Sequence, residues 1–271
     1  MPPKKSGNFS APSIRKKMKI LSWNVNGIRA IQKKGFLEWL EREKPDILGV
    51  QETKAHPDQL DAFLMHPAGY ETYWAWSTVK KGYSGVAIFT KEKPLSVKRG
   101  FGIKKFDEEG RVLIAEYPGF VFLNIYFPNG KMSDERLQYK MDFYAETLKY
   151  TKMLKAQGKK VVISGDYNTA HKEIDLARPK ENEDTSGFLP IECAWLDKWI
   201  ADGQVDIFRE FHKEPGHYSW WDMKSGARDR NVGWRIDYHF VTKDLAPQVK
   251  SATILRDVVG SDHAPVAIEL K

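Results

Sequence analysis

The chain is poor in cysteine and in long apolar runs. Its single cysteine, Cys193, excludes an intramolecular disulfide and a zinc site built from cysteine ligands. It falls in the apolar run ECAWLDKWI, so we interpret it as a residue of helix packing. No apolar stretch approaches the length of a membrane span, and the polar start has no signal-peptide pattern. We therefore expect a soluble intracellular protein.

Acidic residues are missing from the first nineteen positions, which carry six lysines and arginines. The net charge of the whole chain is +7, so the remainder is close to neutral and bulk charge says little about partners of the folded part. Composition predicts a disordered basic tail over residues 1–17, which either attracts phosphates, directs nuclear import or only aids solubility. No linker or repeat interrupts residues 18–271, so we expect one domain there.

Apolar, β-branched and aromatic runs predict many short strands, and 41% of the residues are hydrophobic, enough for a large core. The expected strands are 19–25, 47–51, 85–90, 112–116, 120–126, 160–164, 236–241 and 265–269. The expected helices are 35–43, 57–63, 133–155 and 190–201. Ser133, followed by two acids, is a good N-cap for the third helix. The hairpin-like pair within 112–126 favours mixed sheets, so we predict an α/β fold with two sheets or one large one.

Six polar strings follow these apolar runs. They are SWNVNG from Ser22, QETK from Gln51, YFPNG from Tyr126, GDYN from Gly165, NVGWRIDY from Asn231 and GSDH from Gly260. Strand ends in an α/β sheet gather catalytic groups at one edge, so side chains far apart in sequence can converge there. The candidates are Asn24, Glu52, Asp166, Asn168, Asp237, Asp262 and His263. This set is typical of a metal-assisted phosphoester hydrolase.

Each residue type suits one part of that chemistry. Magnesium prefers hard oxygen ligands and needs only one or two protein carboxylates, which Glu52 can supply, although alone it would read as an ordinary loop acid. Asp166 can deprotonate or position water. A histidine beside a carboxylate, as His263 beside Asp237 would be, is favoured in its charged form and can stabilise a negatively charged phosphate. The other six histidines are interpreted as surface or packed residues.

The strings, their order and their spacing resemble the exonuclease III type of apurinic/apyrimidinic (AP) endonuclease, within the endonuclease/exonuclease/phosphatase superfamily. The resemblance runs from about Met18 to Lys271. It implies a four-layer α/β sandwich, with two packed mixed β-sheets flanked by helices. It also implies a Mg²⁺ cofactor, for which Mn²⁺ substitutes, with Glu52 as principal ligand and Asn24 and Asp262 close to the ion or its waters.

The same resemblance implies roles for residues around the metal. Asp166 would handle the attacking water, Asn168 would orient it, and Tyr126 and Asn129 would lie near the phosphate. Trp220 and Trp234 would wall a pocket for a sugar without a base. The positions that match contacts with the DNA backbone are Arg29, Lys54, Tyr83 and Arg136.

The implied function is magnesium-dependent cleavage of the phosphodiester 5′ to an abasic site, with 3′–5′ exonuclease or 3′-end-cleaning activity. Its partner would be double-stranded DNA with abasic sites, bound by a monomer in the cytoplasm, or in the nucleus if the source is eukaryotic. One alternative, a sandwich-fold phosphatase or phospholipase, should lack the NVGWRIDY string. Another, a non-catalytic DNA-binding relative, should have lost catalytic residues. The balance between the nuclease activities stays open at this point.

Overall fold

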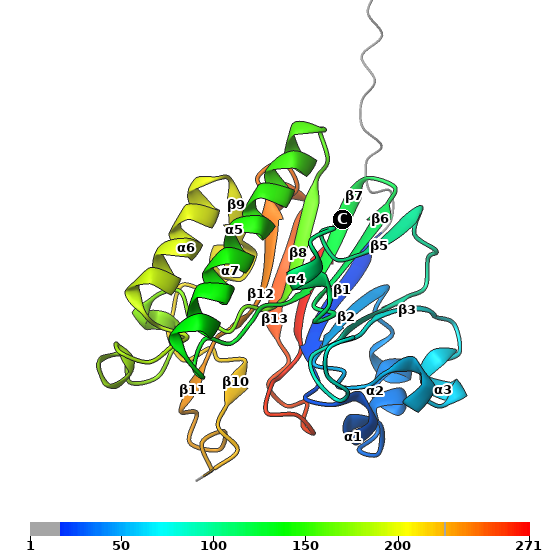
Figure 1. Cartoon of the computed structure of the whole chain (residues 1–271), viewed down its shortest axis with the longest axis horizontal. Coiled ribbons are helices and arrows are strands. Elements are labelled where there is room, and N and C mark those ends of the chain that lie inside the picture. Colours follow the sequence, from blue (N-terminus) through cyan, green and yellow to red (C-terminus); the bar gives the residue numbers. More distant parts are fainter. Residues whose placement is uncertain (1–16, 225) are drawn as a thin grey trace, which may run out of the picture.

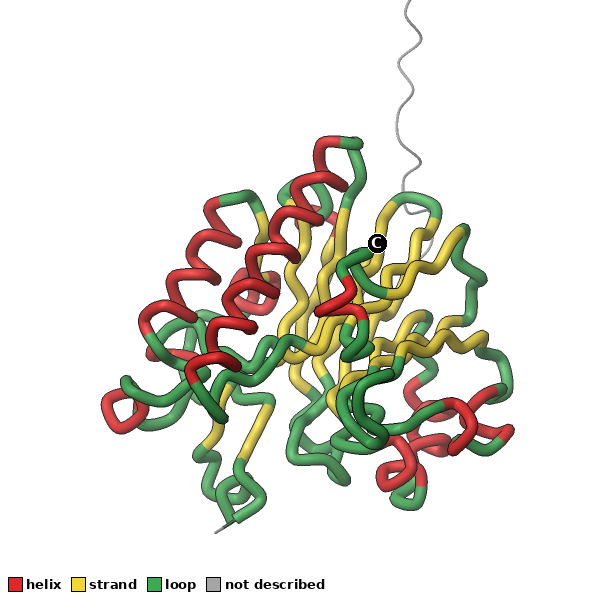
Figure 2. Tube along the Cα trace, viewed as in Figure 1, coloured by secondary structure: helices red, strands yellow, loops and turns green. Residues whose placement is uncertain are grey.

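Two six-stranded β-sheets pack face to face in the computed structural model, which describes residues 17–224 and 226–271 (Figures 1 and 2). The predicted basic tail lies outside the described residues except for Lys17. The first sheet runs β13 (Val249–Ile254), β14 (Val266–Leu270), β1 (Met18–Asn24), β2 (Ile47–Gln51), β4 (Val86–Thr90), β3 (Glu71–Ala75). The second runs β5 (Ser96–Arg99), β6 (Val112–Tyr117), β7 (Phe120–Tyr126), β8 (Val161–Asp166), β12 (Asp237–Thr242), β9 (Gln204–Asp206).

The main hydrophobic core lies between the sheets. Ile20 and Ile88 from the first sheet meet Leu113, Phe122 and Val162 from the second, all of them fully buried. Both sheets are mixed: β1 pairs in parallel with β2, and β7 with β8, whereas β6 and β7 form the expected antiparallel hairpin. Inward-facing apolar residues on two sheets produce a sandwich core, which is the arrangement found here.

Helices cover the outer face of each sheet. The first is covered by α1 (Ile28–Gln32), α2 (Phe36–Glu43) and α3 (Ala62–Met65), with Phe36 and Trp39 packed on Trp23. The second is covered by α5 (Asp134–Ala156) and α6 (Pro190–Ala201), which lie on the opposite side of the molecule in Figure 1. The predicted four-layer α/β sandwich is therefore confirmed. Cys193 lies half-buried in α6.

Local signals explain where several elements begin and end. The Ser133 hydroxyl accepts a hydrogen bond of 3.3 Å from the backbone N–H of Arg136, so the predicted N-cap of α5 is present. Gly49 in β2 leaves room for a polar side chain between the sheets, because a Cβ there would lie 2.8 Å from Oδ1 of Asn124. Asn124 Nδ2 donates to two backbone carbonyls of the facing sheet, those of Val50 and Ala87.

The predicted helix over 57–63 is wrong as one element. A 3₁₀ turn, Pro57–Gln59, is followed by the extended residue Leu60, and Asp61 then caps the short α3 by accepting from the N–H of Leu64. Sequence reasoning also missed β3, β5, β9 and β13, the short helices α1, α4 (Lys104–Asp107) and α7 (Ile207–Phe211), and the hairpin of β10 (Trp220–Trp221) and β11 (Gly233–Trp234). None of the described helices is long and apolar enough to cross a bilayer.

Candidate active site

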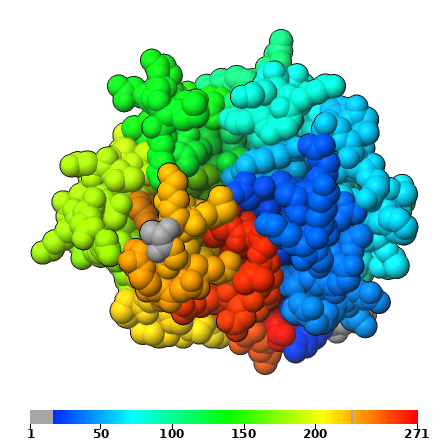
Figure 3. Space-filling view, turned by 90° about the horizontal axis from the view of Figure 1, so that it is seen from below, coloured from blue at the N-terminus to red at the C-terminus, as the bar shows by residue number. Residues whose placement is uncertain are grey.

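Strand register brings the predicted catalytic residues to one end of both sheets. Asn24 ends β1 opposite Gln51, the last residue of β2, so Glu52 emerges beside it. In the second sheet Tyr126 ends β7 opposite Asp166, and Asp237 begins β12 opposite the same residue. Figure 3 views this end, where N-terminal (blue) and C-terminal (red) segments lie beside the β10–β11 hairpin (orange).

A buried histidine and two carboxylates form the centre of the site. Nδ1 of His263 lies 2.9 Å from Oδ2 of Asp237, and its Nε2 lies 3.9 Å from Oδ2 of Asp166. The Ser219 hydroxyl donates to the same Asp237 oxygen at 2.6 Å. Burial opposes a charge on His263, but the attraction of Asp237 and of the neighbouring aspartates outweighs it and raises the pKa of His263 to about 10. The imidazole is therefore held as a cation.

Asp166 links the two sheets. Nδ2 of Asn24 donates to Oδ2 of Asp166 at 2.9 Å and to Oε1 of Glu52 at 3.0 Å. The backbone N–H of Asn168 donates to the other oxygen of Asp166 at 2.8 Å. Complete burial raises the pKa of Asp166 to about 7; His263 opposes this shift, whereas Asp237 and Glu52 add to it. A carboxylate whose pKa lies near neutral pH can act as a general base.

Glu52 occupies a strained turn after β2. Its backbone is in the left-handed region at φ 52°, as are those of Asn26, Lys54 and Asn168. Such conformations are uncommon outside glycine and concentrate at functional sites. Nζ of Lys54 lies 2.7 Å from Oε2 of Glu52. Burial disfavours the charged carboxylate, but Lys54 outweighs burial and lowers the pKa of Glu52.

The donor set at this end fits a divalent cation. Four carboxylates, those of Glu52, Asp166, Asp237 and Asp262, line or underlie the cleft, and Lys54 and His263 contribute the two positive charges in contact with them. The acidic groups outnumber the basic groups in contact with them, and excess negative charge in a buried setting is costly without a counterion. Oxygen donors that carry such an excess are those preferred by Mg²⁺.

A cleft of about 220 Å³ opens above these groups. Trp220 and Trp234 form one side, with ring centroids 6.4 Å apart at 84°, and Nε1 of Trp220 donates to Oδ2 of Asp262 at 3.0 Å. Lys131 extends over both rings. Nδ2 of Asn129 donates to Oδ1 of Asn168 at 3.0 Å, so the predicted Asn129 joins the site through its neighbour.

The predicted DNA-contacting residues fall in three places. Lys54 forms an ion pair with Glu52, and Arg29 is exposed on α1. The other two, Tyr83 and Arg136, meet behind Tyr126: Nη2 of Arg136 donates to the Tyr83 hydroxyl at 3.1 Å, and Nη1 donates to Glu109 at 2.8 Å. Tyr83, Arg136 and Glu109 therefore form a polar network within the protein.

Several site residues carried no signal that sequence reasoning used. The guanidinium of buried Arg111 lies 4.6 Å from the Tyr126 ring centroid and donates to the Tyr83 hydroxyl at 2.7 Å. Ser219 orients Asp237, and Lys131 lines the cleft. Of these, only Lys131 was detectable, because it directly follows the YFPNG string. The others depend on contacts between distant segments.

Comparisons with known proteins agree with this geometry. Residues 21–263 match the Endonuclease/Exonuclease/phosphatase family. The exodeoxyribonuclease of Bacillus subtilis is 44% identical over 253 residues, which cover 93% of this chain and 98% of that protein. The DNA repair nuclease APEX1 of Danio rerio is 41% identical over 255 residues, which cover 93% of this chain and 82% of that protein. The structure of an AP endonuclease from Archaeoglobus fulgidus superimposes with a TM-score of 0.84 at 30% identity, covering 94% of this chain and 99% of that one. This chain belongs to the endonuclease/exonuclease/phosphatase family and, within it, to the exonuclease III type of AP endonuclease.

Proposed function

We propose that this protein is a magnesium-dependent nuclease that cuts duplex DNA 5′ to abasic sites, leaving a 3′-hydroxyl and a 5′-deoxyribose phosphate. The observation that carries the proposal is the pairing of a buried base, Asp166, with a charged His263 held by Asp237. The curated relatives are named exodeoxyribonuclease and DNA repair nuclease, which supports 3′–5′ exonuclease activity as a second reaction of the same site. The protein would act as a monomer.

Each protein group has a step to perform in this reaction. Glu52, Asn24 and Asp262 would hold Mg²⁺, which supplies positive charge near the phosphate when bound. Asp166 accepts the proton of the attacking water, and Asn168 orients that water. Nε2 of His263 donates a hydrogen bond to a phosphate oxygen as negative charge develops on it.

Tyr126 would complete the contacts to the phosphate. Desolvation of the phenol and the negative charge of Glu52 raise the pKa of Tyr126 well above its ordinary value. Its phenol therefore stays protonated at neutral pH and can donate a hydrogen bond without adding negative charge. The position of Tyr126 opposite Asp166 supports a role at the same phosphate.

Duplexes bearing an abasic analogue, a uracil or a recessed 3′ end, incubated with and without Mg²⁺, test this function. Cleavage at the abasic analogue that requires Mg²⁺ and leaves a 3′-hydroxyl is the expected result. Release of mononucleotides from the recessed end, without cleavage at the abasic analogue, would restrict the protein to exonuclease activity. Phosphate release from a phosphomonoester, without cleavage of any duplex, would support the phosphatase alternative.

The aromatic side of the cleft would select the abasic sugar. Extruding a sugar without a base costs less than the few kcal/mol needed to unstack a paired nucleotide, and a tight apolar pocket excludes a base sterically. Trp220→Ala should therefore reduce cleavage at abasic sites and raise relative incision next to ordinary nucleotides. Trp220 also donates a hydrogen bond to Asp262. Trp220→Phe, which removes this hydrogen bond but keeps an aromatic ring, is therefore needed to separate the two effects of Trp220→Ala.

Both Trp220 variants should be compared with Trp195→Ala, which removes a partly buried indole on α6 away from the cleft. We expect the ratio of the two activities to change in Trp220→Ala, to change little in Trp220→Phe and to stay constant in Trp195→Ala. A Trp220→Ala protein with a lower melting temperature and an unaltered ratio would assign Trp220 to packing and reject the pocket.

A further inference from the structure

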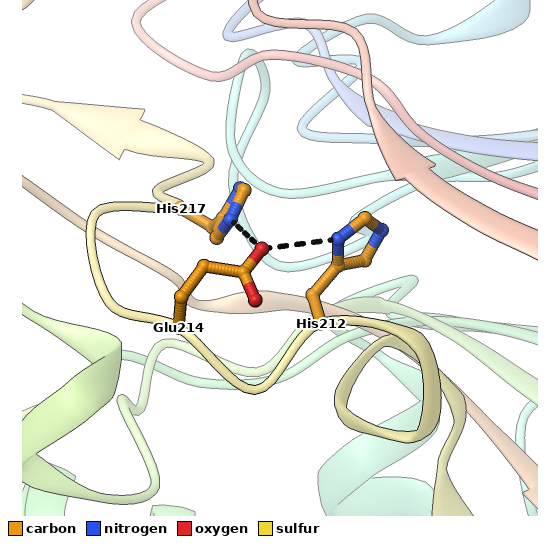
Figure 4. Close-up of side chains that lie close together, drawn as sticks. All are labelled: His212, Glu214 and His217. Carbon is orange, nitrogen blue, oxygen red and sulfur yellow. Dashed lines mark hydrogen bonds and ion pairs between the residues drawn. The ribbon is translucent and has the colours of Figure 1, made fainter.

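Two histidines and a glutamate converge on the surface in the segment that follows α7. Figure 4 shows His212, Glu214 and His217 with their side chains directed toward one another. Nε2 of His217 lies 2.7 Å from Oε1 of Glu214, and Nδ1 of His212 lies 3.5 Å from the same oxygen. All three atoms lie within 4.8 Å of one another. None of these residues lines the catalytic cleft.

The ring of His212 is oriented so that its Nδ1 atom faces Glu214 and its Nε2 atom faces away from it. Its Nε2 lies 2.8 Å from the backbone carbonyl of Ala252 on β13. A carbonyl oxygen can only accept, so Nε2 carries a proton and Nδ1 is the ring nitrogen that faces Glu214. A histidine that ligates a metal is commonly oriented in this way, with its other ring nitrogen donating to a carbonyl or carboxylate.

The backbone of the segment is also held in place. Nη1 of Arg209 donates to the carbonyls of His212 and Glu214 at 3.2 and 2.9 Å, and its Nη2 is anchored 2.6 Å from the buried carboxylate of Asp175. The His212 ring stacks on Phe208 at 4.4 Å and 23°, and the His217 ring meets the same phenyl group at 66°. The backbone of the segment and the two histidine rings therefore start from held positions, which lowers the entropic cost of binding an ion.

We propose that His212, Glu214 and His217 form a second metal site, selective for a borderline ion such as Zn²⁺. Two imidazole nitrogens and one carboxylate oxygen are an established zinc ligand set, and ligand atoms in a tetrahedral site with bonds of about 2.0–2.1 Å lie about 3.3 Å apart. The two separations of 2.7 and 3.5 Å bracket that value. Imidazole ligands favour zinc over magnesium, so the site differs chemically from the oxygen-rich cleft.

The exposure of the cluster suits this role. The Glu214 side chain is 60% exposed, which leaves a fourth position open to water. His217 lies two residues before Ser219, the partner of Asp237, so a bound ion would fix the start of the segment that leads to the active site.

Equilibrium dialysis of the full chain against ZnCl₂, in a non-chelating buffer with excess Mg²⁺, tests the proposal. His212→Ala and His217→Ala should each bind one zinc ion fewer than the wild type. The matched control is His56→Ala, since Nδ1 of His56 lies 2.6 Å from Asp58 in a single histidine–carboxylate pair at the surface. Zinc bound at the catalytic cleft would be the same in all four proteins and cancels from the comparison.

Thermal unfolding supplies a second measurement that does not depend on nuclease activity. An ion that binds the folded state raises the melting temperature. Zn²⁺ should raise the melting temperature more in the wild type and in His56→Ala than in the two site variants. Glu214→Gln, which keeps the side-chain shape, should weaken zinc binding at least tenfold. Equal zinc stoichiometry and equal melting shifts in His217→Ala and the wild type would overturn the proposal.

Discussion

Asp237→Asn removes one charge from the candidate active site and keeps the shape of the side chain. The carboxamide oxygen can still accept hydrogen bonds from Ser219 and His263 in the position of Oδ2. What is lost is the attraction that, after the opposing effect of burial, raises the pKa of His263 to about 10. The variant should therefore change how the activity depends on pH, in addition to lowering it.

The size of the effect follows from the protonation of His263. If its pKa returns to the ordinary value of about 6.5, the charged fraction is about 3% at pH 8, about a quarter at pH 7 and about three-quarters at pH 6. The wild type stays almost fully charged over this range. Protonation alone should then reduce the relative activity of Asp237→Asn about 30-fold at pH 8 and less than about twofold at pH 6.

Single-turnover cleavage of an abasic-analogue duplex at pH 6, 7 and 8 measures this ratio. Dividing the wild-type rate by the variant rate at each pH gives the loss caused by the substitution. The charge of Asp237 also raises the pKa of Asp166, so its removal favours the ionised base most at pH 6 and makes the loss at that pH smaller still. Ser219→Ala is the matched control, because it removes a hydrogen bond from Asp237 without removing the charge, so its loss should not vary with pH. A loss in Asp237→Asn that is equal at pH 6 and pH 8 would refute the electrostatic role of Asp237.

Three further predictions concern the metal, the catalytic pair and a buried histidine. Glu52→Gln should raise the Mg²⁺ concentration needed for half-maximal cleavage; an unchanged titration would remove Glu52 from the metal site. Asp166→Asn and His263→Ala should each lower cleavage about 10²- to 10⁴-fold with duplex binding retained, and the double variant should be little worse than the poorer single one, whereas additive losses would place the two groups in separate sites. Burial lowers the pKa of His239 to about 4, so its contribution to stability is present above pH 6.5 and is lost as the pH falls toward 4. Urea unfolding should show that the wild type loses about 2 kcal/mol more than His239→Gln between pH 7 and pH 5, and equal losses would contradict the shifted pKa.

Local sequence was enough to locate most strands and the polar residues at their ends. Short apolar runs rich in Val and Ile, such as DILGVQ and KKVVISG, favour buried strands in a packed sheet, and the polar residue that follows each run is then expected at the edge of the sheet. Glu52 and Asp166 were found in this way. The cap at Ser133 was found because capping depends on neighbours a few residues away.

Edge strands were harder to predict because they lack the continuous apolar run that marks a buried strand. The strand β5 has the pattern of a mostly exposed segment, and β13 alternates between buried and exposed positions without a long apolar run. Such strands are stabilised by pairing with a neighbour, here β6 and β14, which the local pattern does not identify.

Tertiary structure alone decided which polar groups touch. Asn24 and Asp166 are separated by 142 residues, yet a hydrogen bond of 2.9 Å joins them, because each ends a central strand of a different sheet. The same holds for Arg111 behind Tyr126 and for the choice of Ser219 as the partner of Asp237. The sequence determined which residues stand at strand ends, because a strand and its end can be recognised from a few neighbouring residues. Their charges and pKa values depend on distances of a few ångströms between segments, and those distances are set only when the two sheets pack.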